Sequence, residues 1–348
     1  MKQGKTVFDD TRLKSLLVDT ASPYLPDNVQ ALVRQQLLTW PDLIKARKQL
    51  DKAITRKIVL EHLAVTLQCN PGRIVSARSP VDNESIRNRP CFLCLHNLPS
   101  EQRALQYRDE WLILNNPAPL FPDHLVISHR EHSPQLIRNA LPAMIALVAD
   151  IEFRFSAFYN GPACGASAPD HLHFQMYPER AIPMVEQLAA IVTEDTGQEM
   201  LAKLNGSRQG SCYAGYLDCR SIFFSMAKSP HYLLECLSRA LDCLPAAIEI
   251  PFEPMVNLII SGRDGTYYGL LFPRKAHRPA CYFKPEPDCM VVSPGAVDVA
   301  GLIILPRQED FEKINREMIL QIYQEVCHGT EVFSGFGVGD WGYVARDQ

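Results

Sequence analysis

The segment CGASAPDHLHFQMY (residues 164–177) decides the fold of this chain, because it joins a loop of small residues to a strand-like alternation. In a β-strand, residues two positions apart face the same side, so His171, His173 and Gln175 are predicted to project together. Leu172 and Phe174, which lie between them, then face the core. The pattern predicts two imidazoles and a carboxamide on one side of a single strand.

The loop before this strand is typical of a phosphate-binding site. Gly161, Gly165, Ala166, Ser167 and Ala168 offer backbone N–H groups at close approach and one hydroxyl. An imidazole beside a bound phosphate can attack phosphorus and form a phosphoramidate, while a nearby carboxamide donates to the charged oxygens. The alternative interpretation is a pair of half-buried histidines on an edge strand, without a catalytic role.

Composition bounds the class of protein. The chain has 348 residues, of which 47% are hydrophobic and 21% are charged, with a net charge of −4. This is a globular composition with enough chain for one large core or two smaller ones, and it gives no sign of a polyanion-binding groove. The polar N-terminus and the lack of a long apolar run predict neither a secretory signal nor a membrane span. The scattered set of 11 cysteines indicates reduced thiols, and therefore a cytoplasmic location.

The spacing of apolar residues predicts the elements around the motif. In chain order we expect helices over 11–68 with breaks at Pro23, Pro26 and Pro41, an irregular linker over 69–90, strands at 111–114 and 124–128, one helix over 136–159, and a strand over 171–179.

A second, related unit is expected after the first. Residues 252–282 again predict strand, turn, strand and a basic turn, and LVISHREHSP (125–134) aligns with LLFPRKAHRP (270–279). Residues 291–307 then take the place of the loop and strand that carry the histidines, but contain none, and 310–327 predicts a terminal helix. The alternative is chance similarity between amphipathic strands. The fold class expected is α+β, with two related halves of which only the first carries the motif.

The motif GxSxPxHxHxQ, at 165–175, resembles the active-site motif of the histidine-triad superfamily. It is most similar to the branch with glutamine in place of the third histidine, which contains galactose-1-phosphate uridylyltransferase, diadenosine tetraphosphate phosphorylase and the GDP-hexose phosphorylases. The segment LNNPAPLFPDHLVISHREH (114–132) agrees, and the pairing of RPCFLC (89–94) with the motif also resembles a bacterial family of unknown function. The resemblance covers 85–180 well and 250–315 loosely.

The resemblance implies a pseudo-dimer of histidine-triad-like halves with an N-terminal helical extension. The expected division is 1–84 for the extension and linker, 85–245 for the catalytic half and 246–348 for the degenerate half. The N-terminal helices and residues 181–250 are not explained by the resemblance.

Carried over residue by residue, the resemblance gives roles to the motif. It makes His173 the nucleophile, with His171 beside it, and Gln175 a ligand of the transferred phosphoryl group. The Gly165–Ser167 backbone, through Ala166, and the Ser167 hydroxyl would hold the adjacent phosphate. Asn116 stands where the superfamily usually has an acidic residue for the ribose hydroxyls, so that role is in doubt. His124 is expected to be structural.

The resemblance also implies a structural zinc site formed by Cys91, Cys94, His132 and His171, since two thiolates and two imidazoles suit tetrahedral zinc. His96 or His129 could instead take the place of a histidine in this ligand set. The alternative is that both cysteines are small core residues. No organic cofactor is expected.

The second half is expected to supply charge to the phosphates through Lys275 and Arg278, and the linker through Arg73, Arg78 or Arg89. Each of these could instead be a solvated surface cation. Asp298 falls where the repeat places the first histidine of the motif, and no role is assigned to it.

The expected function is a nucleotidyltransferase or phosphorylase with a covalent nucleotidyl-histidine at His173. Its substrate would be a nucleoside-diphosphate sugar or a dinucleoside polyphosphate, and its acceptor phosphate or a sugar phosphate. The alternatives are a hydrolase of nucleotide conjugates and a non-catalytic nucleotide-binding module. No nucleic acid or membrane partner is expected. The sequence does not decide the base, the sugar, or the choice between monomer and homodimer.

Overall fold

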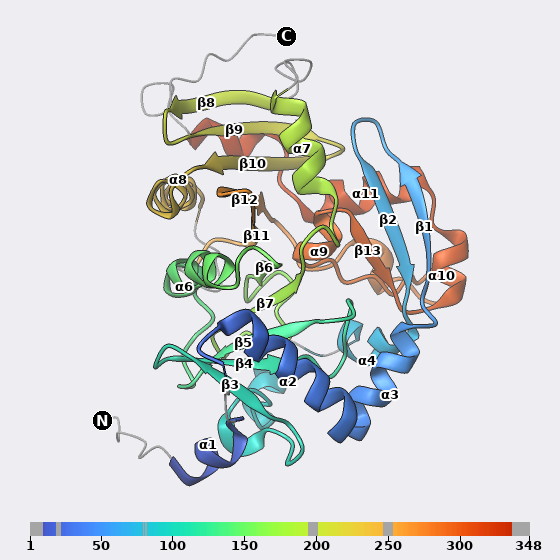
Figure 1. The fold of residues 1–348 in the computed structure, drawn as a ribbon. Helices are drawn as coiled ribbons and strands as arrows, with labels where there is room; N and C mark the ends of the chain where they lie inside the picture. The colour runs from blue at the N-terminus through green and yellow to red at the C-terminus, as the bar shows by residue number, and fades with distance from the viewer. Residues whose placement is uncertain are drawn as a thin grey trace, which may run out of the picture.

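The computed structural model describes residues 10–18, 22–78, 80, 82–193, 201–245 and 253–335. Its centre is one large antiparallel sheet with helices on both faces, and a small sheet lies beside it (Figure 1). This is the expected α+β class. In the part of the chain described, no helix is long and apolar enough to cross a membrane.

The large sheet has ten strands in the spatial order β3-β4-β5-β7-β6-β11-β12-β10-β9-β8. Their bounds are β3 (Ala104–Tyr107), β4 (Trp111–Asn115), β5 (Leu125–His129), β6 (Phe155–Asn160), β7 (His173–Pro178), β8 (Leu201–Ser207), β9 (Gly210–Leu217), β10 (Arg220–Ala227), β11 (Val256–Arg263) and β12 (Thr266–Pro273).

The sheet consists of two halves with the same strand order, joined by antiparallel pairing of β6 with β11. Each half has three strands, a helix and two further strands, and the helices are α6 (Ile137–Asp150) and α8 (Pro230–Asp242). The two-half architecture is therefore as expected. The correspondence between the strands of the two halves differs from our expectation. In the second half, β12 takes the position that β7 has in the first half, and β10 takes that of β5.

The expected alignment of 125–134 with 270–279 is wrong, because it matches β5 to β12 on the local likeness of a strand followed by a basic turn. Residues 291–307 accordingly do not replace the motif strand. The strand order leads us to propose that the second half begins between 193 and 201, instead of at 246.

The two halves differ most in the connection between their last two strands. In the first half, β6 and β7 are joined by residues 161–172, whereas β11 and β12 are joined by Asp264 and Gly265 alone. Both turn residues have positive φ, 50° and 71°, as a tight hairpin requires. The second half therefore has no counterpart of the 161–172 loop, for which phosphate binding was predicted.

The N-terminal segment is only partly helical. Helices α1 (Asp10–Leu16), α2 (Leu25–Thr39) and α3 (Pro41–Leu50) are followed by two strands, β1 (Ile54–Val59) and β2 (Ala64–Cys69). The expected helix over 11–68 is thus wrong beyond residue 50. These strands are rich in β-branched residues, which favour extended structure, and β2 pairs in parallel with β13 (Leu302–Leu305).

Two further helices were predicted too long. The segment expected as one helix over 136–159 ends at Asp150, where Glu152 and Phe153 adopt positive φ, and continues as β6. The expected terminal helix is split into α10 (Gln308–Lys313) and α11 (Arg316–Val326), because the Asn315 side chain accepts the Met318 N–H and begins a new helix. The remaining elements are the short helices η1 (Pro71–Arg73), α4 (Ile74–Ala77), α5 (Asn83–Asn88), η2 (Leu95–Asn97), α7 (Met184–Thr193), η3 (Ala280–Phe283), α9 (Ala296–Val299) and η4 (Thr330–Gly335).

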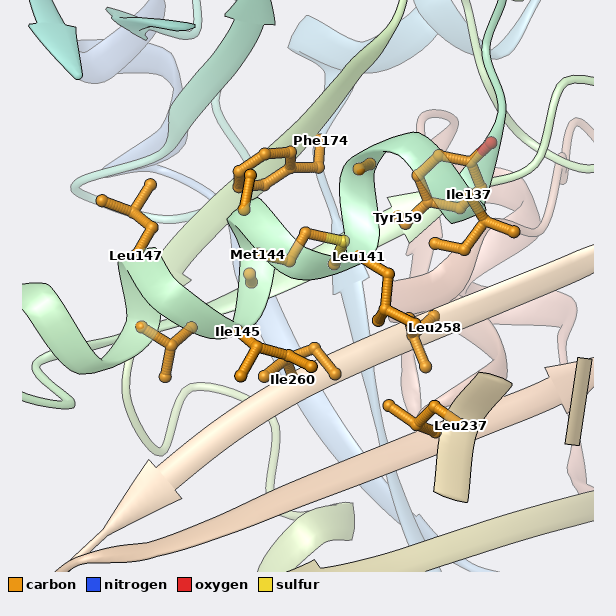
Figure 2. Packing of buried hydrophobic residues seen from close by; sticks show 14 of the residues in the cluster. Ile137, Leu141, Met144, Ile145, Leu147, Tyr159, Phe174, Leu237, Leu258 and Ile260 are labelled. Atoms are coloured by element: carbon orange, nitrogen blue, oxygen red, sulfur yellow. The ribbon is translucent and has the colours of Figure 1, made fainter. Parts of the chain in front are cut away.

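One face of the large sheet packs against α2, α6 and α8, and Figure 2 shows this core around α6. Leu141 and Met144 of α6 lie among Phe174 of β7 and Leu258 of β11, so the helix spans both halves. Leu172 and Phe174 belong to this core, as expected from the alternation of the motif. The opposite face of β7 is therefore left to His173 and Gln175.

Candidate active site

A cavity of about 500 Å³ lies on the face of the sheet opposite α6. His173 and Gln175 of β7 line it, together with Asn116 after β4 and the loop residues Gly165–Ser167. The linker contributes Arg73, Val75, Ser76 and Ala77 to the cavity wall. The second half contributes His277, Arg278, Ser293, Gly295, Val297, Asp298 and Ile304. Three parts of the chain that are distant in sequence thus enclose one site.

His173 is buried and has its imidazole oriented by the backbone. Its Nδ1 lies 2.8 Å from the carbonyl oxygen of His171, an atom that can only accept, so Nδ1 carries the proton. The lone pair is then on Nε2. Burial lowers the pKa of His173 from its ordinary value, which keeps this ring neutral and nucleophilic near neutral pH.

The backbone of His173 is held by Gln135, a residue that no motif or local spacing in the sequence indicated. The Gln135 Oε1 accepts the His173 N–H at 2.8 Å, and its Nε2 donates to the His173 carbonyl at 2.8 Å. The same Nε2 donates to the carbonyl of Asn160 at 3.1 Å. One buried amide therefore fixes the start of β7 and the end of β6.

The carboxamide of Gln175 has a defined orientation. Ala118 N–H donates to Asn116 Oδ1 at 2.9 Å, so the Asn116 NH2 group faces Gln175 and donates to its Oε1 at 3.2 Å. The Gln175 Nε2 has no protein acceptor within the described residues, and Gln175 lines the cavity. Its two N–H bonds are thus available to a ligand.

His124 completes this arrangement from behind. Its Nδ1 accepts the Leu120 N–H at 3.1 Å, so the ring proton is on Nε2. This N–H donates to the side-chain oxygen of Gln175. Burial, with the charge of Arg73, lowers the pKa of His124 to about 3. The neutral, fully buried ring has the satisfied environment of a structural histidine, as the sequence analysis expected.

A second carboxamide, that of Asn160, lies at the end of β6. Its Oδ1 accepts two hydrogen bonds, from Asn257 Nδ2 at 3.0 Å and from Ala296 N–H at 2.7 Å. Asn160 lines the cavity, and its NH2 group has no acceptor among the residues that the structure describes. The signal in the sequence is a polar residue between an apolar strand and a glycine-containing loop, which by itself is weak.

The loop between β6 and β7 is closely packed at Gly165. Its φ is +113°, and a Cβ atom there would come within 2.9 Å of Gly295 Cα and 3.2 Å of Asn160 Oδ1. The N–H of Ala166 is already bonded to the Gly161 carbonyl at 3.3 Å. The N–H groups of Gly165 and Ser167, which line the cavity, have no protein acceptor in the described chain, so both can donate to a ligand.

The expected cations are placed unequally. Arg73 and Arg278 line the cavity, whereas Lys275 is exposed outside it and Arg78 is exposed beside Glu286. Arg89 lies behind the loop, where its guanidinium donates to the Ser167 carbonyl at 2.9 Å. Burial lowers the pKa of Arg73 to about 10, which leaves it charged at neutral pH.

His277 and Asp298 add polar groups to the second-half wall. Burial and the charges of Arg278 and Arg274 lower the pKa of His277 to about 3, so it is neutral. The Asp298 carboxylate accepts the N–H groups of Gly295 and Ile304, each at 2.9 Å, and fixes the segment between them. Burial raises the pKa of Asp298 to about 6. Asp298 is therefore a structural acceptor in this wall.

Cys91, Cys94, His132 and His171 form one cluster, with their ligand atoms all within 4.8 Å of one another. The Cys91 and Cys94 sulfurs lie 3.4 and 3.6 Å from His171 Nδ1, and the Cys94 sulfur lies 3.2 Å from His132 Nδ1. Bond lengths of about 2.3 Å for Zn–S and about 2.0 Å for Zn–N give similar ligand separations in a tetrahedral site. The donor set fits a metal ion.

The second nitrogens of both imidazoles have partners that suit metal ligands. His171 Nε2 donates to the His129 carbonyl at 2.8 Å, which leaves Nδ1 free to coordinate. The His132 Nε2 lies 3.7 Å from an oxygen of Asp170. The expected substitutes His96 and His129 are not part of the cluster.

Comparisons with known proteins agree with this fold. A model of a domain of unknown function, DUF4922, matches residues 32–178, and a model of the GDPGP1-like C-terminal domain matches 199–336. No curated protein matches the sequence. The start of the second match agrees with the proposed boundary between 193 and 201.

The fold is also similar to that of yeast Ap4A phosphorylase Apa2. The identity is 16%, over 86% of this chain and 97% of that chain, with a TM-score of 0.57. The structure of the same enzyme in complex with Ap4A gives 14% identity, the same coverage and a TM-score of 0.54.

The match of residues 199–336 to a GDPGP1-like C-terminal domain and the fold shared with Apa2 agree with the resemblance to the branch that has glutamine in place of the third histidine.

Proposed function

We propose that the protein is a nucleotidyltransferase of the phosphorylase type, acting on a nucleoside-diphosphate sugar or a dinucleoside polyphosphate through a nucleotidyl-His173 intermediate. The observation that supports this most directly is the orientation of His173. Its Nδ1 is committed to the His171 carbonyl, so the Nε2 lone pair is available for attack in a cavity that also exposes amide donors.

In the first step, His173 Nε2 attacks the α-phosphorus and forms a P–N bond. The bond between this phosphorus and the bridging oxygen breaks, and the leaving sugar phosphate or nucleotide takes the electron pair. With Nδ1 still protonated, the phosphorylated ring is an imidazolium cation. The Nδ1–H bond to the His171 carbonyl stabilises its positive charge. In the second step, an oxygen of the acceptor phosphate attacks phosphorus, and the P–N pair returns to Nε2.

The charge that develops on the phosphoryl oxygens requires donors that are already in position. The NH2 groups of Gln175 and Asn160 and the N–H groups of Gly165 and Ser167 are such donors. Arg73 and Arg278, on the opposite wall, suit the second phosphate or the acceptor. We assign Asn116 to the orientation of Gln175, and a contact with the ribose is a further role open to it.

The nature of Gln175 favours transfer over hydrolysis. A carboxamide cannot donate a proton as an acid, so the leaving group must depart as a stable anion. A sugar phosphate or a nucleotide does so without protonation. A phosphate acceptor likewise attacks as an anion and needs no general base.

We also propose that the cluster of Cys91, Cys94, His132 and His171 binds structural zinc. The ion would connect the segment before β3 to the strand that carries His173. It would fix the ring and backbone of His171, whose carbonyl orients the nucleophile. No chemical step passes through the metal.

The test is intact mass spectrometry of the protein after mixing with UDP-, GDP- and ADP-sugars and with diadenosine tetraphosphate, in the absence of acceptor. Samples are kept neutral or alkaline, because phosphoramidates are acid-labile. A nucleoside-monophosphate adduct on the wild type and none on His173→Ala is the expected result, and the adduct mass identifies the base.

Two other outcomes would contradict the proposal. Free nucleoside monophosphate without an adduct, released at full rate without acceptor, would indicate a hydrolase. No adduct and no turnover with any donor, together with unchanged nucleotide affinity in His173→Ala, would indicate a non-catalytic binding module.

A further inference from the structure

A chain of hydrogen bonds connects the second half of the molecule to the cavity. Arg274, after β12, donates through NH1 to Asn257 Oδ1, and Asn257, on β11, donates through Nδ2 to Asn160 Oδ1 at 3.0 Å. Arg274 and Asn257 are buried, with 1% and 0% of their surface exposed. Neither residue lines the cavity, whereas Asn160 does.

The direction of every bond in this chain is determined by its ends. A guanidinium can only donate, so the Asn257 oxygen must face Arg274. The Asn257 NH2 group then faces Asn160, and it also donates to the Cys164 carbonyl at 2.8 Å, which can only accept. At Asn160, the Ala296 N–H donates to the same oxygen at 2.7 Å. A flipped amide at either asparagine would place two donors or two acceptors against each other.

We propose that Arg274 and Asn257 are positioning residues, which hold the Asn160 amide with its NH2 group toward the transferred phosphoryl group. This inference rests on the proposed function, because it concerns the rate of the same transfer. It gives the half without a motif a role in the chemistry of the other half. That role is exerted through one side-chain amide, without contact with the substrate.

The surroundings of Arg274 show that its charge is fixed in place. Its remaining N–H groups donate to the backbone carbonyls of Val326, Pro294, Ala276 and His277, at 3.0 to 3.3 Å. A buried cation at the end of two aligned amides polarises both of them in the same sense. This increases the partial positive charge on the Asn160 NH2 group.

The variant that tests the orientation is Asn257→Asp. The carboxylate has nearly the same shape and still accepts from Arg274, but it cannot donate to Asn160 or to the Cys164 carbonyl. The Asn160 amide is then expected to turn its NH2 group toward the new carboxylate and its oxygen toward the phosphoryl group. We expect the single-turnover rate of adduct formation at saturating donor to fall about 10- to 100-fold, with little change in donor affinity.

A double-mutant comparison shows whether the loss passes through Asn160. If it does, Asn160→Ala with Asn257→Asp reacts at the rate of Asn160→Ala alone. Losses that multiply in the double variant, or a wild-type rate in Asn257→Asp, would overturn the proposal.

Ser261→Ala is the matched control. The Ser156 hydroxyl donates to the Ser261 hydroxyl at 2.8 Å, which is also a buried side-chain bond between β6 and β11. Its loss should lower the melting temperature and leave the rate unchanged.

If Asn257→Asp does not fold, Arg274→Lys and Arg274→Gln carry the test. Lysine can only donate to Asn257, so it keeps the Asn257 oxygen facing position 274. Glutamine can turn its own oxygen toward Asn257, so the Asn257 amide is no longer held in one orientation. We expect Arg274→Lys to form adduct faster than Arg274→Gln at similar melting temperatures. Equal rates would contradict the inference. Failure of the wild type to form any adduct would instead count against the proposed function, so the two failures are distinguishable.

Discussion

His173 is held in place by a residue far from the motif. Gln135 accepts from the N–H group of His173 and donates to its carbonyl, so Gln135→Met leaves both groups without their buried partner. Each unsatisfied buried group costs about 1–3 kcal/mol, so we expect a loss of about 3 kcal/mol in the free energy of unfolding. We also expect slower adduct formation. Chemical denaturation and single-turnover mass spectrometry measure the two effects.

Gln36 provides the control, because it makes the same kind of clamp without lining the cavity or contacting His173. Its Oε1 accepts the Arg103 N–H at 2.8 Å and its Nε2 donates to the Glu101 carbonyl at 3.1 Å. Gln36→Met should therefore destabilise the protein without slowing the reaction. An equal rate loss in both variants would show that the effect of Gln135 is general destabilisation.

At this scale, the sequence predicted what local spacing encodes. The alternation of His171, His173 and Gln175 was visible because the three candidate residues lie within five positions, although β7 begins only at His173 and His171 precedes it. The cluster of two cysteines and two histidines was implied only by the family resemblance, and the structure brings its four residues together. Gln135, Asn160, Asn257 and Arg274 could not be found, since their partners are set by the pairing of distant strands.

At the scale of elements, we expect opposite effects from replacing a glycine in the loop between β6 and β7 and one in the turn between β11 and β12. A Cβ at Gly165 would approach Gly295 and Asn160, whereas a Cβ at Gly265 would meet nothing within 4 Å. Gly165→Ala should slow adduct formation at least about 10-fold by displacing the Asn160 amide. Gly265→Ala should cost about 1 kcal/mol of stability from its positive φ alone, with an unchanged rate.

The outcome that would contradict this prediction is a wild-type rate in Gly165→Ala. Both variants place an alanine at positive φ, so Gly265→Ala controls for this conformation without the steric contact that Gly165→Ala adds. Single-turnover mass spectrometry with melting curves is sufficient.

The N-terminus of α6 gives the molecule a pH-dependent anchor. The Glu253 carboxylate, which precedes β11, accepts the Ile137 N–H at 3.0 Å and the Tyr159 hydroxyl at 2.8 Å. Burial raises its pKa from 4.5 to about 7, against the opposing effect of these hydrogen bonds. Since the folded state binds this proton more tightly than the unfolded chain, the associated stability is complete below pH 4.5 and is lost as the pH rises through 7.

Glu253→Gln removes this titration while retaining an acceptor for both donors. We expect the unfolding free energy of the wild type, relative to the variant, to fall by about 3 kcal/mol between about pH 5 and about pH 8. Urea denaturation at several pH values measures this difference. A constant difference would show that Glu253 has an ordinary pKa.

The errors in the predicted elements have a common cause. The segment 51–68 contains apolar residues at spacings that fit both a helix and a strand, and only its pairing with β13 decides between them. The helix over 136–159 was extended too far because the break at Glu152 and Phe153 depends on a backbone conformation that no turn residue announces. The hairpin of β11 and β12, with its Asp-Gly turn, was predicted correctly.

At the scale of the whole molecule, the proposed zinc would connect the segment before β3 to the residues that lead into β7. We expect about one zinc per chain by elemental analysis. Its removal by a chelator should lower the melting temperature and the rate of adduct formation, because the His171 backbone would lose its anchor. Cys94→Ser should reproduce both effects. A metal-free protein with unchanged melting temperature and rate would exclude this structural role.

The presence of two related halves was predicted correctly, but the strands of one half were matched to the wrong strands of the other. A strand followed by a basic turn with histidine and proline occurs at 125–134 and at 270–279, and this local likeness outweighed the weaker alternation of β8, β9 and β10. The equivalence of β12 with β7 is visible only in the order of strands. Such an order results from pairing between segments far apart in the chain, which apolar spacing does not record.

The two-residue connection between β11 and β12 has a consequence for stoichiometry. A molecule built from two similar halves could in principle carry two covalent labels, and its halves could alternate in turnover. Asp264 and Gly265 leave no room for a second loop like that of residues 161–172, so within the described residues we expect a single reactive centre per chain. An active-site titration should therefore release one leaving group per chain in its initial burst, and the progress of that burst should follow a single exponential.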